Sequence, residues 1–452
     1  MSWFAGRRYR RIAVAVAIVI AGMSIISKPV PARPQSAIGW KQLTSQPNGP
    51  PARAQYGMTS NGAGSIYVYG GRGSNGILGD FWNWSKTTAT WLKLDNNGMP
   101  DLVEPHLVED SSGNVYEFGG IGSSTGAHFS EDGHSSGLYK YNPALNQWTD
   151  ITDPRAAPGV SWPLAREDHG FAYDPVGNAF WVFAGEGPGT RPLNDMWRYD
   201  IAAGTWQQIQ QTYSAPSSAT IDPREIYQIS YDGHGGFYLF GGADLLDVSG
   251  QPVSQAYVND LWRFEITTRH WSLLAGRANQ YDPRMPIPRH YYGQASDVNG
   301  NFYILGGFSS DSNFPPYFDF NTAHDVAQLV VFEGSADPSS VIMYAMSDFW
   351  EFNARQNRWS NLGRRLGDLT GEPFIPYNMV ADTKSGTLLT FGGYHMDGNV
   401  ELALSSGLWS YKLPPTADHA MTNTAQLALS NKRVNVPVAT PPISPGRHGL
   451  AR

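Results

Sequence analysis

Cysteine is absent from the 452 residues of the chain, and charged residues make up only 16% of it. Without cysteine the chain can form no disulfide and can offer no thiolate ligand to a metal ion. An exported domain without disulfides needs another source of stability, and closure of a ring of sheets would supply one. This favours, weakly, a protein of the bacterial envelope.

Positive charge is also scarce. The formal net charge is −7, and it becomes −13 once the six basic residues before position 37 are set aside. A surface of that sign does not attract phosphate backbones, so nucleic-acid binding through a basic patch is excluded. We also find no Gly-Xaa-Ser-Xaa-Gly nucleophile motif, no phosphate-binding loop, and no helix able to present a His-Glu-Xaa-Xaa-His zinc motif.

One apolar run stands near the start of the chain, over residues 12–27, after the basic residues Arg7, Arg8, Arg10 and Arg11. Basic residues stay on the cytoplasmic side while the apolar segment enters the membrane, so the remainder is expected to be exported to the periplasm or the extracellular space. Sixteen residues are long for a signal-peptide core and short for a full span. Residues 1–36 are therefore interpreted as a leader helix with a Pro-rich linker, either a cleaved signal peptide or a retained membrane anchor.

Glycine (49 residues) and aromatic residues (13%) are abundant, and they occur in a repeating pattern. Between residues 223 and 274, four apolar segments of four to six residues alternate with polar turns. This spacing predicts a four-stranded antiparallel meander. One such sheet cannot bury both faces, so it is expected to stack on copies of itself.

Copies of the pattern recur along the chain. A Gly pair or its variant ends the second strand of each unit, at Gly70-Gly71, Gly119-Gly120, Ala184-Gly185, Gly241-Gly242, Gly306-Gly307 and Gly392-Gly393. An apolar-aromatic pair opens the third strand, at Phe81-Trp82, Leu138-Tyr139, Met196-Trp197, Leu261-Trp262, Phe349-Trp350 and Leu408-Trp409. Nine residues further stands a fourth-strand tryptophan in five units, namely Trp91, Trp148, Trp206, Trp271 and Trp359.

The sixth unit lacks this last strand, because Asp418 stands nine residues after Trp409 in a segment without a strand pattern. The missing sequence is found before the first unit, at Trp40-Lys41-Gln42-Leu43. We therefore predict a closed ring of six sheets in which the N-terminal strand completes the last sheet and covers its edge.

These glycine pairs and aromatic positions, repeating about every 50 residues, resemble the kelch family of β-propellers. The resemblance implies an all-β, six-bladed propeller over residues 37–413. It implies little about function, because kelch propellers include adaptors, secreted binding proteins and a few carbohydrate-active enzymes. Residues 414–452, rich in Pro, Ala, Thr, Asn and Ser and without periodicity, are predicted to be a disordered tail.

The start of each first strand shares a rim with the loops that follow the Gly pairs, because both connections emerge at the same end of a meander. Four of these openings contain arginine; the second and sixth have Leu102 and Ile375 instead. A ring of guanidinium groups with aromatic neighbours could bind carboxylates or hydroxyls at the mouth of the propeller, the end of its central channel at this rim. The predicted ligand-binding residues are Arg53, Tyr56, Arg166, His169, Arg224, Tyr227, Arg289, His290, Tyr291 and Tyr377. The alternative is that each arginine packs within its blade and bonds loop carbonyls.

Three further segments contain residues suited to chemistry or binding. The insertion at 308–348 is long and aromatic, which suggests a lid, a partner-binding crest, or a loop packed on its own blade. The loop containing His128, Glu131, Asp132 and His134 is interpreted as solvated rather than as a weak metal site. In the Arg166-Glu167-Asp168-His169 opening, strand alternation would place Glu167 and His169 on one face, and a hydrogen-bonded, turn-forming histidine is preferred to a catalytic one.

We therefore predict an exported recognition module, with a possible membrane tether through residues 12–27, that binds a protein or polysaccharide at the mouth. No catalytic residue, metal or cofactor is assigned. The resemblance leaves open a sugar mutarotase or epimerase-like enzyme and a structural scaffold, but not a copper radical oxidase, which needs a Tyr-Cys crosslink. Two desolvated carboxylates beside a histidine in the mouth would favour the enzyme, and a mouth sealed by packed side chains would favour the scaffold.

Overall fold

The computed structural model describes residues 39–44, 48–60, 64–123, 128–214, 220–226, 228–246, 252–276, 282–309, 326–331, 341–362, 374–396 and 402–413. The predicted leader and tail lie outside these residues, as does most of the insertion at 308–348. In the described part of the chain, no helix has the length and apolarity to cross a membrane.

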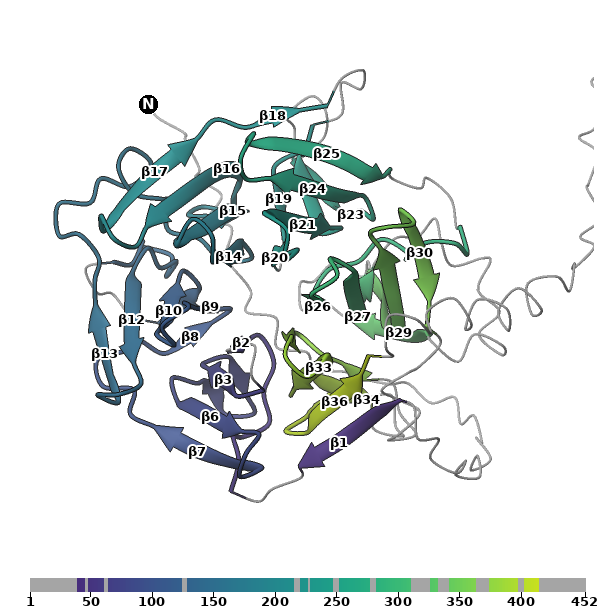
Figure 1. Cartoon of the computed structure of the whole chain (residues 1–452), viewed down its shortest axis with the longest axis horizontal. Helices are drawn as coiled ribbons and strands as arrows, with labels where there is room; N and C mark the ends of the chain where they lie inside the picture. Colours follow the sequence, from purple (N-terminus) through teal and green to yellow (C-terminus); the bar gives the residue numbers. More distant parts are fainter. Residues whose placement is uncertain are drawn as a thin grey trace, which may run out of the picture. The chain divides into compact units, whose positions relative to one another are not determined.

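Six antiparallel sheets surround a common centre, as predicted (Figure 1). Blade 1 contains β2 (Gly57–Ser60), β3 (Ile66–Tyr69), β6 (Phe81–Ser85) and β7 (Thr90–Leu94). Blade 2 contains β9 (His106–Glu109), β10 (Val115–Phe118), β12 (Leu138–Asn142) and β13 (Gln147–Asp150). Blade 3 contains β14 (Gly170–Asp174), β15 (Ala179–Gly187), β16 (Arg191–Asp200) and β17 (Thr205–Ile209).

The remaining blades follow the same order. Blade 4 contains β20 (Ser230–Tyr231), β21 (Gly236–Phe240), β24 (Leu261–Glu265) and β25 (His270–Ala275), with β18 (Thr212–Tyr213) added parallel to β25. Blade 5 contains β26 (Gly293–Ser296), β27 (Phe302–Ser309), β29 (Val341–Asn353) and β30 (Arg358–Asn361). Blade 6 contains β32 (Met379–Asp382), β33 (Thr387–Phe391), β36 (Leu408–Lys412) and β1 (Trp40–Thr44).

Short extra strands flank the blades. They are β4 (Arg72–Gly73) with β5 (Gly76–Ile77), β8 (Leu102–Val103) with β11 (Ile121–Gly122), β19 (Arg224–Glu225) with β22 (Ala243–Leu246) and β23 (Pro252–Tyr257), and β31 (Phe374–Ile375) with β34 (Tyr394–Met396) and β35 (Leu402–Leu404). In the blade-5 insertion, β28 (Val326–Val331) pairs with the first part of β29.

Closure of the ring by the N-terminal strand is confirmed. β1 pairs antiparallel with β36, and Trp40 lies opposite Tyr411 in the register. Figure 1 shows β1 at the outer edge of the sixth blade. Trp40 is buried and contacts the rings of Phe349 in blade 5 and Tyr411 in blade 6, so the first ordered strand joins the two ends of the propeller.

Aromatic and aliphatic side chains fill the spaces between successive blades. One interface, for example, contains Phe118, Phe171, Phe180 and Trp206 from blades 2 and 3. Tryptophans of the third and fourth strands recur in these clusters, which explains the repeated aromatic positions of the sequence. The apolar core is therefore a series of interfaces between sheets, as expected where no blade can bury its faces alone.

The second glycine of each pair is required by a close backbone contact at the rim. A Cβ on Gly242 would lie 2.4 Å from the carbonyl oxygen of Glu225, and one on Gly393 would lie 2.2 Å from that of Ile375. Both glycines also have positive φ angles, of 98° and 87°. The opening segment of each first strand thus passes directly against its own glycine pair, and this contact sets the position of the mouth.

Candidate functional site at the propeller mouth

The four predicted rim arginines are fully buried inside their blades. Arg289 donates from Nη1 to the Gly306 carbonyl (2.9 Å) and from Nε to the Ile287 carbonyl (3.1 Å). Its Nη1 and Nη2 also bond both carboxylate oxygens of Asp348, at 2.6 and 2.8 Å. The same arrangement joins Arg53 to Asp80, Arg166 to Asp195 and Arg224 to Asp260. The four arginines therefore pack within their blades and bond loop carbonyls, as the alternative interpretation predicted.

The aspartate partners of these arginines were not predicted, although the sequence marks them. Each stands directly before the apolar-aromatic pair of the third strand, and the indole of that pair also donates to it, as Trp350 Nε1 does to Asp348 at 2.6 Å. The two blades without the arginine have glycine at this position, Gly137 and Gly407. The joint occurrence of Arg and Asp in four blades therefore indicates an internal ion pair.

Residues three positions after the arginine join neighbouring blades. The hydroxyl of Tyr56 donates to the Phe391 carbonyl of blade 6, and that of Tyr292 donates to the Phe240 carbonyl of blade 4. His169 is buried against His106 of blade 2, with 4.3 Å between ring centroids, and neither of its ring nitrogens has a hydrogen-bond partner. The expectation of a hydrogen-bonded His169 was therefore wrong, because the ring packs into an apolar interface. The predicted site residue Tyr227 lies outside the described residues.

Residues two positions after the arginine site form the innermost part of the mouth. In four blades this residue has a positive φ angle: Gln55 (55°), Glu104 (57°), Asp168 (50°) and Tyr291 (53°). Non-glycine residues seldom adopt this conformation, which is costly and concentrates at functional sites. The strand alternation expected for residues 166–169 does not hold, because the chain turns at Asp168 before β14 begins.

Carboxylates gather on one half of the mouth. Asp168 accepts a hydrogen bond from the Tyr291 hydroxyl (3.1 Å), which reaches it from blade 5. Glu104 accepts one from Gln55 Nε2 (2.5 Å). Glu104, Asp168 and Glu225 are 3–5% exposed. With Glu167 and Glu186, which are partly exposed, the group contains five carboxylates; we call these five residues the acidic half of the mouth.

Crowding and burial raise the pKa values of Glu104, Asp168 and Glu225. Burial, followed by the charge of Glu167, raises the pKa of Glu104 to about 7. Burial, together with the nearby carboxylates of Glu104 and Glu225, holds the pKa of Asp168 well above its usual range. The pKa of Glu225 is raised by burial and by its hydrogen bond and charge interaction with Glu186. Burial and mutual repulsion therefore favour the protonated forms of Glu104, Asp168 and Glu225.

Aromatic rings occupy the other half of the mouth. The ring of Tyr291 lies 3.9 Å from that of His290 and 5.1 Å from that of Tyr377, measured between centroids. Tyr377 in turn lies 5.7 Å from Tyr394, and Tyr394 lies 6.3 Å from Phe308. We call these five residues, contributed by blades 5 and 6, the aromatic half. His290 Nε2 has no hydrogen-bond partner and lies 4.0 Å from Asp168 Oδ1, where the two halves meet.

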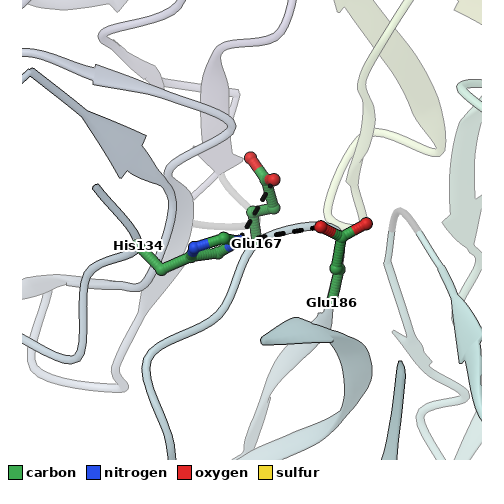
Figure 2. A group of neighbouring side chains, drawn as sticks. All are labelled: His134, Glu167 and Glu186. Atoms are coloured by element: carbon green, nitrogen blue, oxygen red, sulfur yellow. Dashed lines mark ion pairs between the residues drawn. The ribbon is translucent and has the colours of Figure 1, made fainter. Parts of the chain in front are cut away.

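A histidine and two glutamates form a separate group at the edge of the acidic half (Figure 2). His134 Nε2 lies 3.3 Å from Glu167 Oε1 and 4.0 Å from Glu186 Oε1. Glu167 lies in the opening of blade 3, Glu186 lies on β15, and His134 comes from the blade-2 loop. His134 is fully buried, so the interpretation of this residue as part of a solvated loop was wrong. The loop folds inward at an isolated pairing of His134 with Ile121.

Of the predicted site residues, the mouth brings together His290, Tyr291 and Tyr377. Arg53, Arg166, Arg224, Arg289, Tyr56 and His169 lie behind it, within or between blades. The carboxylates that dominate the mouth were not predicted as site residues. They do have a signal, because Glu104, Glu167, Asp168 and Glu225 lie one or two positions after the arginine site and Glu186 directly follows Ala184-Gly185.

Closed ring, meandering sheets and a central mouth define a six-bladed β-propeller. Residues 126–326 match a sequence model of the KLHDC2/KLHL20/DRC7 Kelch-repeats domain. Together with the glycine pairs and fourth-strand tryptophans, this match confirms the resemblance of the propeller to the kelch-repeat family.

Several proteins with different names are similar to part of this chain. The chain is 26% identical to human leucine-zipper-like transcriptional regulator 1 over 254 residues, which are 56% of this chain and 27% of that protein. It is 24% identical to human Kelch domain-containing protein 10 over 259 residues, 50% of this chain and 52% of that one. It is 22% identical to Arabidopsis thaliana acyl-CoA-binding domain-containing protein 4 over 281 residues, 60% of this chain and 37% of that one. The chain thus matches about a quarter to a half of the length of these relatives.

Proposed function

We propose that the chain is a protein-binding propeller whose mouth binds a basic segment of its partner, with a lysine or arginine side chain entering between the acidic and aromatic halves. The observation that carries this proposal is the accumulation of buried carboxylates with raised pKa values beside a wall of tyrosines. The resemblance to the kelch-repeat family supports the general role in protein binding.

The charge of the mouth supports a cationic ligand. The four buried arginines that would bind an anion are each paired with an aspartate, so their positive charge is already balanced. Among the carboxylates, Glu104 accepts a hydrogen bond from Gln55, and Asp168 accepts one from Tyr291. Both donors are neutral side chains. An arriving ammonium or guanidinium group would stabilise the ionised carboxylates and be stabilised by them.

The aromatic half supports the same ligand. A cation within about 6 Å of a tyrosine ring gains roughly 0.5–2 kcal/mol from the ring quadrupole, more where water is excluded. Tyr291 both donates to Asp168 and stacks near Tyr377, so it links the two halves. A side chain with an apolar stem and a cationic end would contact both halves at once.

The proposal is tested with the full-length chain and an array of peptides that differ in lysine, arginine, aspartate and glutamate content. We expect basic peptides to bind and acidic ones to fail, with affinity falling as salt is added. Asp168→Asn should weaken binding at least tenfold, whereas Asp153→Asn, which removes a partly exposed carboxylate paired with Arg155, should not. Preference for acidic peptides, or equal loss in both variants, would refute the proposal. Failure of every peptide class would favour the scaffold interpretation.

A second candidate function is supported by the pair Glu104 and Asp168, which are buried, hydrogen-bonded to each other and share raised pKa values. Two carboxyl groups of this kind can exchange a proton near neutral pH, as an enzyme acting on sugars would require, and the tyrosines would stack on a sugar ring. The test is the rate of anomer exchange of aldoses, followed by NMR with the wild type and Glu104→Gln. A rate equal to the uncatalysed one would exclude this mutarotase-like candidate.

The exported setting is part of the proposal and is supported by the basic and apolar character of residues 7–27. N-terminal sequencing of the protein recovered from membrane and soluble fractions tests it. A chain that retains Met1 in the membrane fraction indicates an anchor, and a chain that begins near residue 33 in the exported soluble fraction indicates a cleaved signal peptide.

A further inference from the structure

We propose that His134, Glu167 and Glu186 form a binding site for a divalent transition metal ion of the zinc type. Of the acidic half this proposal uses only Glu167 and Glu186, and it leaves Glu104, Asp168 and Glu225, together with the aromatic half, for the basic ligand.

The ligand atoms have the separations that such an ion requires. One ligand atom from each of His134, Glu167 and Glu186 lies within 4.8 Å of the other two, and His134 Nε2 lies 3.3 Å from Glu167 Oε1 and 4.0 Å from Glu186 Oε1. Metal bonds of about 2.0–2.2 Å at tetrahedral angles place neighbouring ligand atoms roughly 3.4 Å apart. Figure 2 shows the three side chains pointing toward one point. A ligand set of two carboxylates and one imidazole suits zinc and its neighbours in the first transition row.

The histidine is held in the orientation that a metal ligand needs. Its Nδ1 lies 2.8 Å from Asp132 Oδ1, and its buried Nε2 faces the two glutamates and meets no hydrogen-bond geometry with any described residue. Asp132 is itself fixed by the Ser130 hydroxyl (2.6 Å) and by the Gly189 amide (2.7 Å). A carboxylate behind a histidine ligand selects the tautomer whose Nε2 lone pair faces the metal and strengthens it as a donor.

The site is also accessible from the mouth. The Glu167 and Glu186 side chains are 15% and 13% exposed, while His134 is fully buried. An ion can therefore enter from solvent, bind three protein groups and keep an open position for water. The competing interpretation is a structural ion pair in which a protonated His134 holds the two glutamates, and it predicts no metal affinity.

The test is calorimetric titration of the full-length chain, stripped with EDTA, with zinc chloride at pH 7.5, together with cobalt(II) absorption in the visible range. We expect one ion per chain with a dissociation constant in or below the micromolar range. Cobalt should give the intense bands of a low-coordinate site.

Amino-acid substitutions distinguish zinc binding at this site from zinc binding elsewhere on the chain. Glu167→Gln and Glu186→Gln, both at partly exposed positions, should each weaken zinc binding at least tenfold. Asp132→Asn, which acts through His134, should weaken it about 10–100-fold. His128→Gln is the matched control, because His128 lies in the same loop but pairs with Asp150. Absence of saturable one-to-one binding at 100 µM zinc, wild-type affinity in both glutamate variants, or loss of binding in the His128 control would overturn the proposal.

Discussion

Arg289 and Asp348 form a bidentate ion pair inside blade 5, with both side chains removed from solvent except for 11% of the aspartate. The arginine also bonds the carbonyl of Gly306, so the pair ties the opening of the first strand to the glycine pair and to the start of the apolar-aromatic pair in β29. Its function is to fix the rim from which the mouth is built.

Arg289→Ala should therefore destabilise the propeller strongly. The substitution leaves the buried carboxylate of Asp348 without its partner. We therefore expect the free energy of unfolding to fall by about 3–5 kcal/mol. Urea unfolding followed by tryptophan fluorescence measures it. Arg284→Ala is the control, because that arginine is 86% exposed in its pair with Asp282 and its removal should leave the unfolding midpoint nearly unchanged. Equal unfolding midpoints for the two variants would contradict the packing role.

The carboxylates of the mouth should make stability depend on pH. The pKa of Glu104 is raised from 4.5 to about 7 by burial and the charge of Glu167, so the folded chain binds more protons than the unfolded chain between these values. Its contribution is complete below about pH 4.5 and is lost as the pH rises through 7. Glu104→Gln should flatten this fall in the thermal midpoint between pH 5 and 8. An unchanged profile would show that Glu104 does not titrate in this range.

Binding of a basic peptide should show the opposite pH dependence. Burial and neighbouring charges raise the pKa values of Glu104 and Asp168, which favours their protonated forms. A cation binds their ionised forms, so affinity should increase as the pH rises from 6 to 8. Fluorescence anisotropy of a labelled lysine-rich peptide measures this. Affinity that falls over the same range would indicate a ligand that needs the protonated acids.

Glu117 on β10 should oppose folding at high pH. It is fully buried, neither carboxylate oxygen has a hydrogen-bond partner, and burial raises its pKa well above the usual range. Val68 and Leu239 occupy the corresponding positions before the Gly pairs of blades 1 and 4. Glu117→Leu should raise the free energy of unfolding by about 1–3 kcal/mol, more at pH 9 than at pH 5. Glu131→Gln, at an exposed position, should have no such effect. A destabilised Glu117→Leu would imply a partner for this carboxylate.

Trp40 should be essential to ring closure. Its indole packs between Phe349 and Tyr411, and its Nε1 has no hydrogen-bond partner. Trp40→Ala should cost about 3–5 kcal/mol, whereas Trp40→Phe keeps the apolar contact and should cost clearly less. Thermal unfolding and limited proteolysis near β36 measure these effects. Equal stability of the alanine variant and the wild type would mean that β1 does not seal the ring.

Local sequence was sufficient for the architecture of this protein. Paired glycines, aromatic pairs and a fourth-strand tryptophan at a constant spacing predicted six blades, and Trp40 predicted how they close. This was possible because each blade is a short, contiguous unit whose strands pair with their sequence neighbours. The residues that determine one blade therefore lie within about 50 consecutive positions.

Only the tertiary structure decided what lines the mouth. Burial of Arg289 depends on Asp348, and the environment of His134 depends on Glu167 and Glu186 in the next blade. Left-handed turns at Glu104 and Asp168 then bring side chains of separate blades together, against the alternation of a regular strand. The charge, the burial and the separations of the side chains in the mouth are properties of the closed ring. They arise where all six blades meet, so the sequence of a single repeat does not determine them.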